Sequence, residues 1–450
     1  MAELVYDENG RLLFTKEMKE EYTILFPTML PVHFGLMARI LETEGFHVEM
    51  LTTNHRGIVD EGLKYVHNDT CYPALLVIGQ LIDAVKSGKY DMHKVALLIT
   101  QTGGGCRASN YIHLLRKALE KAGLSYIPVI SVNLSGLEPN PGFKLGLNTL
   151  RKAVFAMMYG DIIVQTANQV RPYEVSRGQT DETIEAVETQ LLEAMNQGKG
   201  LSFKSMVANF DRIVAAFKAI PVAGEPKVRV GVVGEIYIKY SPLGNNNLEE
   251  FLLSEGAEPV VPGLTDFIIF KIYNREVDVN IYGGKWVKKK VCQVLKGYVE
   301  KCQRAMIAAM KKGGFRAPGT FEDLRRLIQG YLGEGNKMGG LAAHRRDVGA
   351  HPLRHPQHRL HTALRLPAKP HCGQGHDPQA QGRLSLLQHR GHRLRSRGHQ
   401  DQPGEPHQAD AGQRPGPGQA GGGAPGGWGG RSCVRPSPLW TPARKSTSRP

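Results

Sequence analysis

The feature that most constrains the fold is Leu97–Tyr111, LLITQTGGGCRASNY, where an apolar segment leads directly into three glycines. The pattern predicts a buried strand over Val95–Thr100 and an amphipathic helix from Tyr111. Cys106 then lies in the tight connection at the carboxyl end of a strand, where open α/β sheets bind ligands and cofactors. Glycines permit close backbone approach, and a helix N-terminus favours the thiolate that binds metal. The structural alternative is a buried cysteine in a glycine-rich turn.

Short apolar runs alternate with helical patterns through the first part of the chain, which is typical of βαβ units and a parallel sheet. The predicted strands are Tyr22–Phe26, Phe46–Leu51, Val95–Thr100 and Tyr126–Val132. The predicted helices are Val32–Glu44, Gly57–Val66, Pro73–Lys86, Tyr111–Ala122 and Phe143–Met158, and residues 160–220 are predicted to be helical throughout.

After the linker Pro221–Lys227, a second α/β unit is predicted. It comprises a strand over Val228–Val233, a polar loop from Gly234 to Asn247, a helix over Asn247–Ser254, an apolar run at Pro259–Val261, a mainly helical segment Asp266–Met310 and a short helix Phe321–Leu332. The fold class is therefore α/β, with two parallel-sheet domains of flavodoxin or Rossmann type. The predicted bounds are 1–21 for a lead-in, 22–159 for the first domain, 160–226 for a helical connection, 227–337 for a truncated second domain and 338–450 for a disordered tail.

The basic charge of the chain is concentrated in its last residues. From Gly339 onward, 17 Lys and Arg stand against 5 Asp and Glu, a charge of +12 that leaves +3 on the preceding residues. The nearly neutral body gives no reason to expect a nucleic-acid partner. The tail has no Phe, Tyr or Ile and holds 11 of the 17 histidines, so we expect it to be disordered. Alternative interpretations are a basic nucleic-acid-binding tail and a His-rich metal tract.

A translational frame shift explains the tail better than either alternative. With free codon choice and reading one nucleotide later, the segment from Ala342 to His407 can encode apolar strands such as NIVC and NIVAIDY. We therefore expect the second domain to be interrupted near Lys337. Resequencing the DNA tests this hypothesis.

The cysteines are widely spaced, which argues against a disulfide scaffold and for a reducing, cytoplasmic compartment. They are Cys71, Cys106, Cys292, Cys302, Cys372 and Cys433. We expect no membrane segment, because no apolar stretch of about 18 residues and no signal-peptide core occurs. Cys292 and Cys302 are expected to pack in a core with Val291, Val294, Leu295 and Met306, and the two tail cysteines are expected to be without function. His33, His47 and His67 are interpreted as structural or surface residues.

Cys71 and Cys106 each precede a predicted helix, so both can converge at one end of the strands. By spacing alone they can supply part of an iron–sulfur site, which takes Cys thiolates at each iron, but two cysteines do not complete one. No GxxxxGK[ST] motif occurs, so we do not expect this chain to hydrolyse ATP.

Three motifs resemble a known family. The CYPA of Cys71–Ala74, the QTGGGCRASNY of Gln101–Tyr111 and the GEIYIKYSPLGNNNLEEFL of Gly234–Leu252 resemble 2-hydroxyacyl-CoA dehydratase-type proteins. The closest resemblance is to the subgroup often fused behind an activase ATPase and grouped with double-cubane-cluster reductases. In the shifted frame, TQPFACLPNH resembles the family's third cysteine motif, whose cysteine codon straddles Leu366 and Pro367 here and is lost.

The resemblance implies electron chemistry. Cys71 and Cys106 would bind an iron–sulfur cluster, either [4Fe–4S] or double-cubane, and the N–H groups of Gly103, Gly104 and Gly105 would donate to its sulfides. A separate ATP-hydrolysing activase would deliver a low-potential electron, and the protein would act as a homodimer or heterodimer. The reaction would be radical dehydration of a 2-hydroxyacyl-CoA, which makes the protein a lyase, or reduction of a small molecule. The motifs assign no catalytic or substrate residues. A non-catalytic relative of the activase system and an inert frame-shifted product remain the alternatives.

Overall fold

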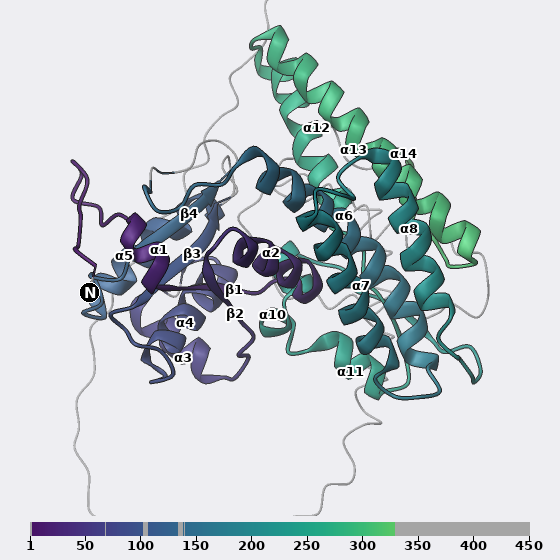
Figure 1. The fold of residues 1–450 in the computed structure, drawn as a ribbon, viewed down its shortest axis with the longest axis horizontal. Helices are drawn as coiled ribbons and strands as arrows, with labels where there is room; N and C mark the ends of the chain where they lie inside the picture. The colour runs from purple at the N-terminus through teal and green to yellow at the C-terminus, as the bar shows by residue number, and fades with distance from the viewer. Residues whose placement is uncertain (1, 68, 102–106, 134–137, 139, 329–450) are drawn as a thin grey trace, which may run out of the picture. The chain divides into compact units, whose positions relative to one another are not determined.

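The computed structural model describes residues 2–67, 69–101, 107–133, 138 and 140–328 (Figure 1). The predictions for Gly103–Cys106 and for the tail from residue 338 lie outside these residues.

The first sheet has four strands in the order β2-β1-β3-β4, and every neighbouring pair is parallel. The strands are β1 (Thr23–Pro27), β2 (His47–Leu51), β3 (Val95–Gln101) and β4 (Val129–Asn133). Thr23 pairs with His47 on one side and with Val95 on the other, and Leu97 pairs with Val129. The predicted α/β fold with a parallel sheet is confirmed.

Alternate side chains of the central strands enter two cores on opposite faces of the sheet. One core contains Leu25, Val95, Leu97 and Ile99, and the other contains Ile24, Phe26, Ala96 and Leu98. The first core is covered by α3 (Gly57–Tyr65), α4 (Tyr72–Lys86) and α5 (Tyr111–Lys121), and the second by α1 (Lys16–Glu21) and α2 (Pro31–Thr43). Strands that are buried on both faces read as continuous apolar runs, which is why the sequence marks them clearly.

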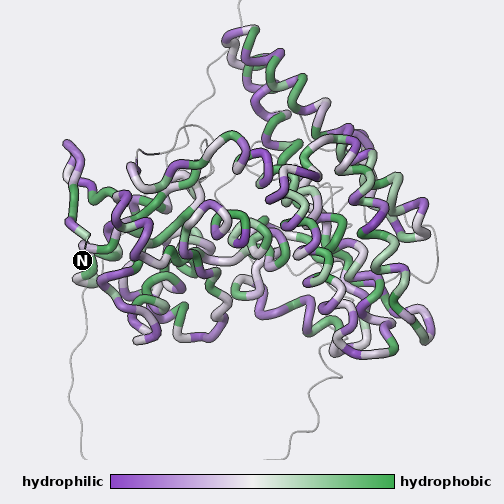
Figure 2. The backbone as a smooth tube through the Cα atoms, viewed as in Figure 1, coloured by the Kyte–Doolittle hydropathy of each residue, from purple (hydrophilic) through white to green (hydrophobic). Residues whose placement is uncertain are grey.

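A large helical cluster follows the sheet in sequence. Its helices are α6 (Leu147–Val170), α7 (Gln179–Asn196), α8 (Phe203–Lys218), α12 (Thr265–Tyr282), α13 (Trp286–Gly313) and α14 (Phe321–Ile328). They share one apolar core, which also takes Leu36 and Ile40 from α2. Apolar and polar residues alternate along these helices in Figure 2, as expected for amphipathic helices. Among the described helices, none has both the length and the apolar character needed to cross a bilayer.

The second sheet consists of two short parallel strands, β5 (Arg229–Gly231) and β6 (Glu258–Val260). Between them lie α9 (Ile236–Tyr240), α10 (Pro242–Asn245) and α11 (Leu248–Ser254). Val230, Val232, Leu252 and Val261 form the centre of a small separate core. Since β6 offers only three residues for pairing, β5 is shorter than the predicted strand Val228–Val233.

The predicted helix start at Phe143 is wrong, because α6 begins at Leu147. Phe143 is buried in the second core of the first sheet, where its ring lies 5.0 Å from that of Phe46. The preceding Gly142 donates its N–H to Phe14 O, and a Cβ on this glycine would lie 1.8 Å from Thr15 O. This close approach holds the segment in a non-helical conformation. Similarly, β4 begins at Val129 rather than at Tyr126.

The prediction of continuous helix over residues 160–220 is also wrong. A short 3-10 turn, η2 (Arg171–Tyr173), ends α6, and Gly178 with φ 93° precedes α7. The Glu174 carboxylate accepts hydrogen bonds from the N–H groups of Gly178 and Thr180, which fixes this first break. At the second break, Ser202 caps α8 by accepting from Ser205 N. Both breaks allow the helices to fold back into one bundle.

Candidate functional site

Cys71 lies at the N-terminus of α4, at the edge of the first sheet where the strands end. It is the N-cap residue of this helix, and Pro73 occupies the first turn. Its side chain is half-buried and packs against the first core of the sheet, which contains Leu97 and Ile99 of β3. The Tyr111 hydroxyl, at the start of α5, donates a hydrogen bond to Cys71 Sγ over 3.2 Å. A helix N-terminus together with a hydroxyl donor stabilises negative charge on sulfur, which is the state of a metal ligand.

A hollow of about 300 Å³ lies next to Tyr111, the donor to this sulfur. It is lined by His67, Asp69, Thr70, Asn110, Tyr111 and Leu114. His67 Nδ1 lies 3.4 Å from Asp69 Oδ2, and both side chains are more than two-thirds exposed. Tyr111 therefore both binds the Cys71 sulfur and lines a solvent-facing hollow. The prediction that His67 is a surface residue is confirmed.

The glycine loop itself, Gly103 to Cys106, lies outside the described residues. The structure describes both segments that flank the loop: β3 ends at Gln101, and the 3-10 turn η1 (Arg107–Asn110) leads into α5. The loop therefore connects the carboxyl end of β3 to the helix that carries Tyr111. The convergence of Cys71 and Cys106 on one cluster stays a prediction.

The third motif, Gly234–Leu252, lies against the same edge of the sheet. Ser241 Oγ donates to Thr28 O just after β1, and Asn54 Nδ2 donates to Asn247 Oδ1 just after β2. Tyr237 and Leu243 are buried in the core that Cys71 contacts. The described parts of three motifs that are far apart in the sequence thus lie at the carboxyl edge of one sheet.

The expected polar loop in this motif is wrong, because Ile236–Tyr240 and Pro242–Asn245 are short helices. The Glu235 carboxylate caps the first of them by accepting from Tyr237 N and Ile238 N. Burial raises the pKa of Glu235, although these backbone hydrogen bonds oppose the shift. Burial also raises the pKa of the Tyr237 hydroxyl to about 12, so this phenol is neutral at physiological pH.

The two cysteines of α13 differ in their surroundings. Cys302 is buried in the helical core, and burial raises the pKa of its thiol. Cys292 is half-buried, and its neighbours Val291 and Val294 are 60 % and 75 % exposed. The prediction of core packing is confirmed for Cys302 and Met306, is not confirmed for Cys292, which belongs to none of the described cores, and is wrong for the two valines and for the exposed Leu295. Cys372 and Cys433 lie outside the described residues.

A buried, hydrogen-bonded pair of side chains was not visible in the sequence. His33 Nε2 lies 2.9 Å from Asp161 Oδ1, and the two side chains are 2 % and 1 % exposed. The same carboxylate accepts hydrogen bonds from Leu264 N and Thr265 N, each over 2.7 Å. Burial would raise the pKa of Asp161, but its bonds to His33 and Thr265 outweigh burial and lower it. The pair joins α2, α6 and the start of α12, and because both side chains are buried we assign it a structural role.

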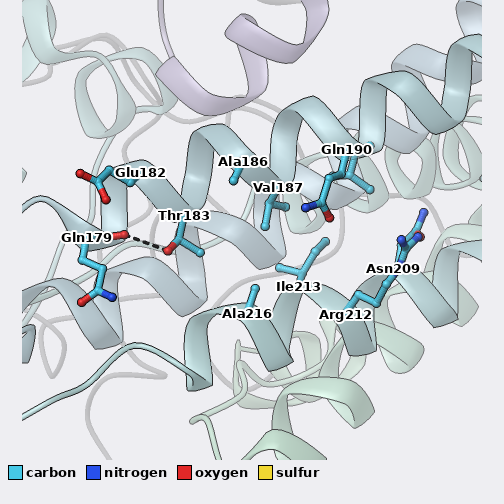
Figure 3. Close-up of a pocket in the computed structure, with 11 residues that line it drawn as sticks. Gln179, Glu182, Thr183, Ala186, Val187, Gln190, Asn209, Arg212, Ile213 and Ala216 are labelled. Carbon is cyan, nitrogen blue, oxygen red and sulfur yellow. Dashed lines mark hydrogen bonds between the residues drawn. The ribbon is translucent and has the colours of Figure 1, made fainter.

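A second hollow, of about 320 Å³, lies between α7 and α8 (Figure 3). Its wall combines apolar side chains such as Ile213 with the polar Asn209 and Arg212. Asn209 donates to the Tyr159 hydroxyl and also accepts from Arg212, so these polar groups bind one another within the helix bundle. The hollow contains no residue of the three motifs.

Cys71 fits the role of one cluster ligand, because it is only half-buried and its sulfur receives a hydrogen bond. Within the described ranges, no group of three or more His, Cys, Asp or Glu side chains is placed to hold a metal ion. A complete ligand set therefore needs residues such as Cys106, outside those ranges.

The chain matches no family model, no curated protein and no solved structure. The family resemblance consequently rests on the three sequence motifs, and the positions of Cys71 and Gly234–Leu252 are the structural facts that bear on it.

Proposed function

We propose that this chain is an iron–sulfur, low-potential electron-transfer protein of the 2-hydroxyacyl-CoA dehydratase type. Cys71 is one cluster ligand at the carboxyl edge of the first sheet, and Cys106 in the glycine loop is a second. The N–H groups of Gly103, Gly104 and Gly105 donate to the cluster sulfides. When bound, the cluster supplies one-electron chemistry, either for radical dehydration of a 2-hydroxyacyl-CoA or for reduction of a small molecule.

The observation that carries this proposal is the contact between the Tyr111 hydroxyl and Cys71 Sγ at a helix N-terminus. A structural cysteine packed in a dry core would have no need of a helix N-terminus, a hydroxyl donor and an adjacent polar hollow. Hydrogen bonds to cluster sulfurs tune the reduction potential, so this tyrosine has a defined role beside a cluster. Tyr111 also lines a hollow, which we propose as the route by which an electron donor or a substrate reaches the site.

The partners follow from the same chemistry. A separate activase hydrolyses ATP and donates the electron, an acyl-CoA is the substrate of the dehydratase reaction, and the protein works as a homodimer or heterodimer in the reducing cytoplasm. The lost third cysteine motif supports two alternatives, a non-catalytic relative of the activase system and an inactive frame-shifted product.

Anaerobic purification followed by iron and sulfide determination tests the proposal. We expect a brown, cluster-containing protein from this chain or, if it lacks the cluster, from a version whose reading frame is repaired near Lys337. Cys71→Ala and Cys106→Ala should each abolish the chromophore, because loss of one thiolate leaves an iron without its ligand. Cys292→Ala, on the distant helical hairpin, is the matched control and should leave the colour intact.

The other outcomes are distinct. Folded, iron-free protein that binds an activase would support the non-catalytic relative, and aggregation or proteolysis back to residue 337 would support the inactive product. Loss of colour in Cys292→Ala would overturn the ligand assignment.

A further inference from the structure

One face of α13 packs in the helical core along the second half of the helix and is exposed to solvent along the first half. Ala309 lies 18 residues after Val291, which is five turns of an α-helix, so the two side chains share one face. Ala309 is 4 % exposed in the helical core, whereas Val291 is 60 % exposed. The cover on this face therefore stops part-way along the helix.

The cover stops where α8 begins. Lys301 Nζ lies 4.2 Å from the ring centroid of Phe203, the first residue of α8, and Lys312 pairs with Asp211 further along. The helices α8 and α13 thus run side by side in the same direction from this point. Before Lys301, α13 continues together with α12 as a helical hairpin (Figure 1).

The exposed part carries an apolar stripe, formed by Val287, Val291, Val294 and Tyr298 and called the α13 stripe below, and the exposed Leu295 lies beside it. Its members are 63 %, 60 %, 75 % and 40 % exposed. Their spacing of four, three and four residues is the a/d spacing of a coiled coil. The stripe is about 17 Å long, which is three turns of a partner helix.

Lysines flank the α13 stripe on both sides. Lys288 and Lys290 occupy the e and g positions that determine partner choice in coiled coils. From Ile281 to Tyr298 the chain carries five lysines and no Asp or Glu, and one of the five, Lys296, pairs with Glu276 of α12. A partner helix that places Glu or Asp opposite these lysines gains attraction, and one with lysines there is repelled.

We propose that the α13 stripe binds an acidic amphipathic helix of another protein, which continues the cover that α8 provides. The charge argues against the other occupants. A second copy would oppose lysine to lysine, and the chain's own tail carries 17 Lys and Arg against 5 Asp and Glu from Gly339 onward. The hairpin also exposes Ile281, Tyr282, Trp286 and Leu295, but the regular a/d spacing of the stripe favours one partner helix over a bilayer surface, which requires no such spacing. This inference does not depend on the iron–sulfur proposal.

The test uses the full chain and two labelled three-heptad peptides with Leu at a and d, one with Glu and one with Lys at e and g. Fluorescence anisotropy should show binding of the Glu peptide alone. Val291→Asp combined with Val294→Asp should weaken it about tenfold or more, since both side chains are already exposed and the fold is kept. Val175→Asp, at a 63 % exposed site away from the hairpin, is the matched control.

A charge reversal sharpens the result. Lys288→Glu combined with Lys290→Glu should weaken binding of the Glu peptide and create binding of the Lys peptide, while Lys218→Glu on α8 should change neither. The proposal is overturned if the full chain binds neither peptide, or if the variants bind as the wild type does. It is equally overturned if Val294→Asp dissociates a dimer in sedimentation, or if flotation shows anionic vesicles as the ligand in place of the peptide.

Discussion

Replacing Asp161 tests whether the His33–Asp161 pair holds the start of α12 against α6. Leu264, the N-cap residue of α12, offers no side-chain cap, and the Asp161 carboxylate takes over that task by accepting from Leu264 N and Thr265 N. A carboxylate at this position also interacts favourably with the helix dipole. Asp161→Ala therefore leaves two buried N–H groups and the His33 ring without their acceptor.

The expected cost follows from these contacts. Leaving one buried donor unsatisfied costs about 1–3 kcal/mol, and Asp161→Ala leaves the N–H groups of Leu264 and Thr265 without their acceptor, so we expect a loss of about 3–5 kcal/mol. Asp161→Asn keeps one acceptor oxygen and presents an NH₂ group in place of the other. One hydrogen bond to a charged group is then lost, which should cost about 2–3 kcal/mol. We therefore expect stability to increase from Asp161→Ala to Asp161→Asn and from Asp161→Asn to the wild type.

Urea unfolding followed by circular dichroism at pH 7 measures these differences. Asp211→Ala is the control, because Asp211 pairs with Lys312 at the surface and such pairs contribute less than about 1 kcal/mol. If Asp161→Ala costs no more than this control, the pair does not stabilise the fold and the argument fails.

The pH dependence gives a second measurement. Because the folded state lowers the pKa of Asp161 below its ordinary value of 3.8, the carboxylate's contribution is fully present above that pH. It is lost as the pH falls through the folded-state pKa. Asp161→Asn should therefore flatten the loss of stability in acid.

Two further changes test the packing and the charge of the helical cluster. Gly160→Ala should destabilise the protein by about 1–3 kcal/mol in urea unfolding, because its Cβ would lie 2.5 Å from His33 Cδ2. Gly35→Ala, in open space within α2, should be neutral or stabilising by up to about 1 kcal/mol, and equal effects at both sites would contradict this. Burial raises the pKa of Glu188 to about 7 despite the nearby Arg39, so its contribution makes the protein lose stability as pH rises from 4.5 to 7. Glu188→Gln should remove that loss and stabilise the protein by about 1–3 kcal/mol at pH 8, and an unchanged pH profile would refute the assignment.

The first sheet was predictable because its strands are buried on both faces. Val95–Ile99 alternates between two apolar cores, so every residue in it is apolar and local sequence identifies it. The position of Phe143 could not be predicted in the same way. Its segment has helical spacing, but contact with Phe46 and the close approach of Gly142 to Thr15 prevent a helix there. These contacts join residues far apart in the chain, and no local pattern contains them.

The candidate site likewise has one part that could be predicted from the sequence and one part that could not. Cys71 was identifiable because a cysteine, a proline and an apolar run together predict a helix start beside a sheet edge. The Tyr111 contact depends on how α4 and α5 pack, and His33 and Asp161 are 128 residues apart in the sequence. A lone histidine in an apolar segment carries no signal of its buried partner. Tertiary contacts of this kind are determined by the whole fold.

The two proposals can fail independently, because they rest on different cores. Cys71 packs against the core of the first sheet, whereas the α13 stripe continues a face of the helical cluster. A protein that lacks iron and still binds an acidic helix would be a docking module whose redox site has been lost. A protein that holds a cluster and ignores the acidic peptides would show that the lysines of the hairpin serve another purpose. Only the combination of iron at Cys71 and an acidic helix on the α13 stripe would make the chain a redox protein with its own docking surface.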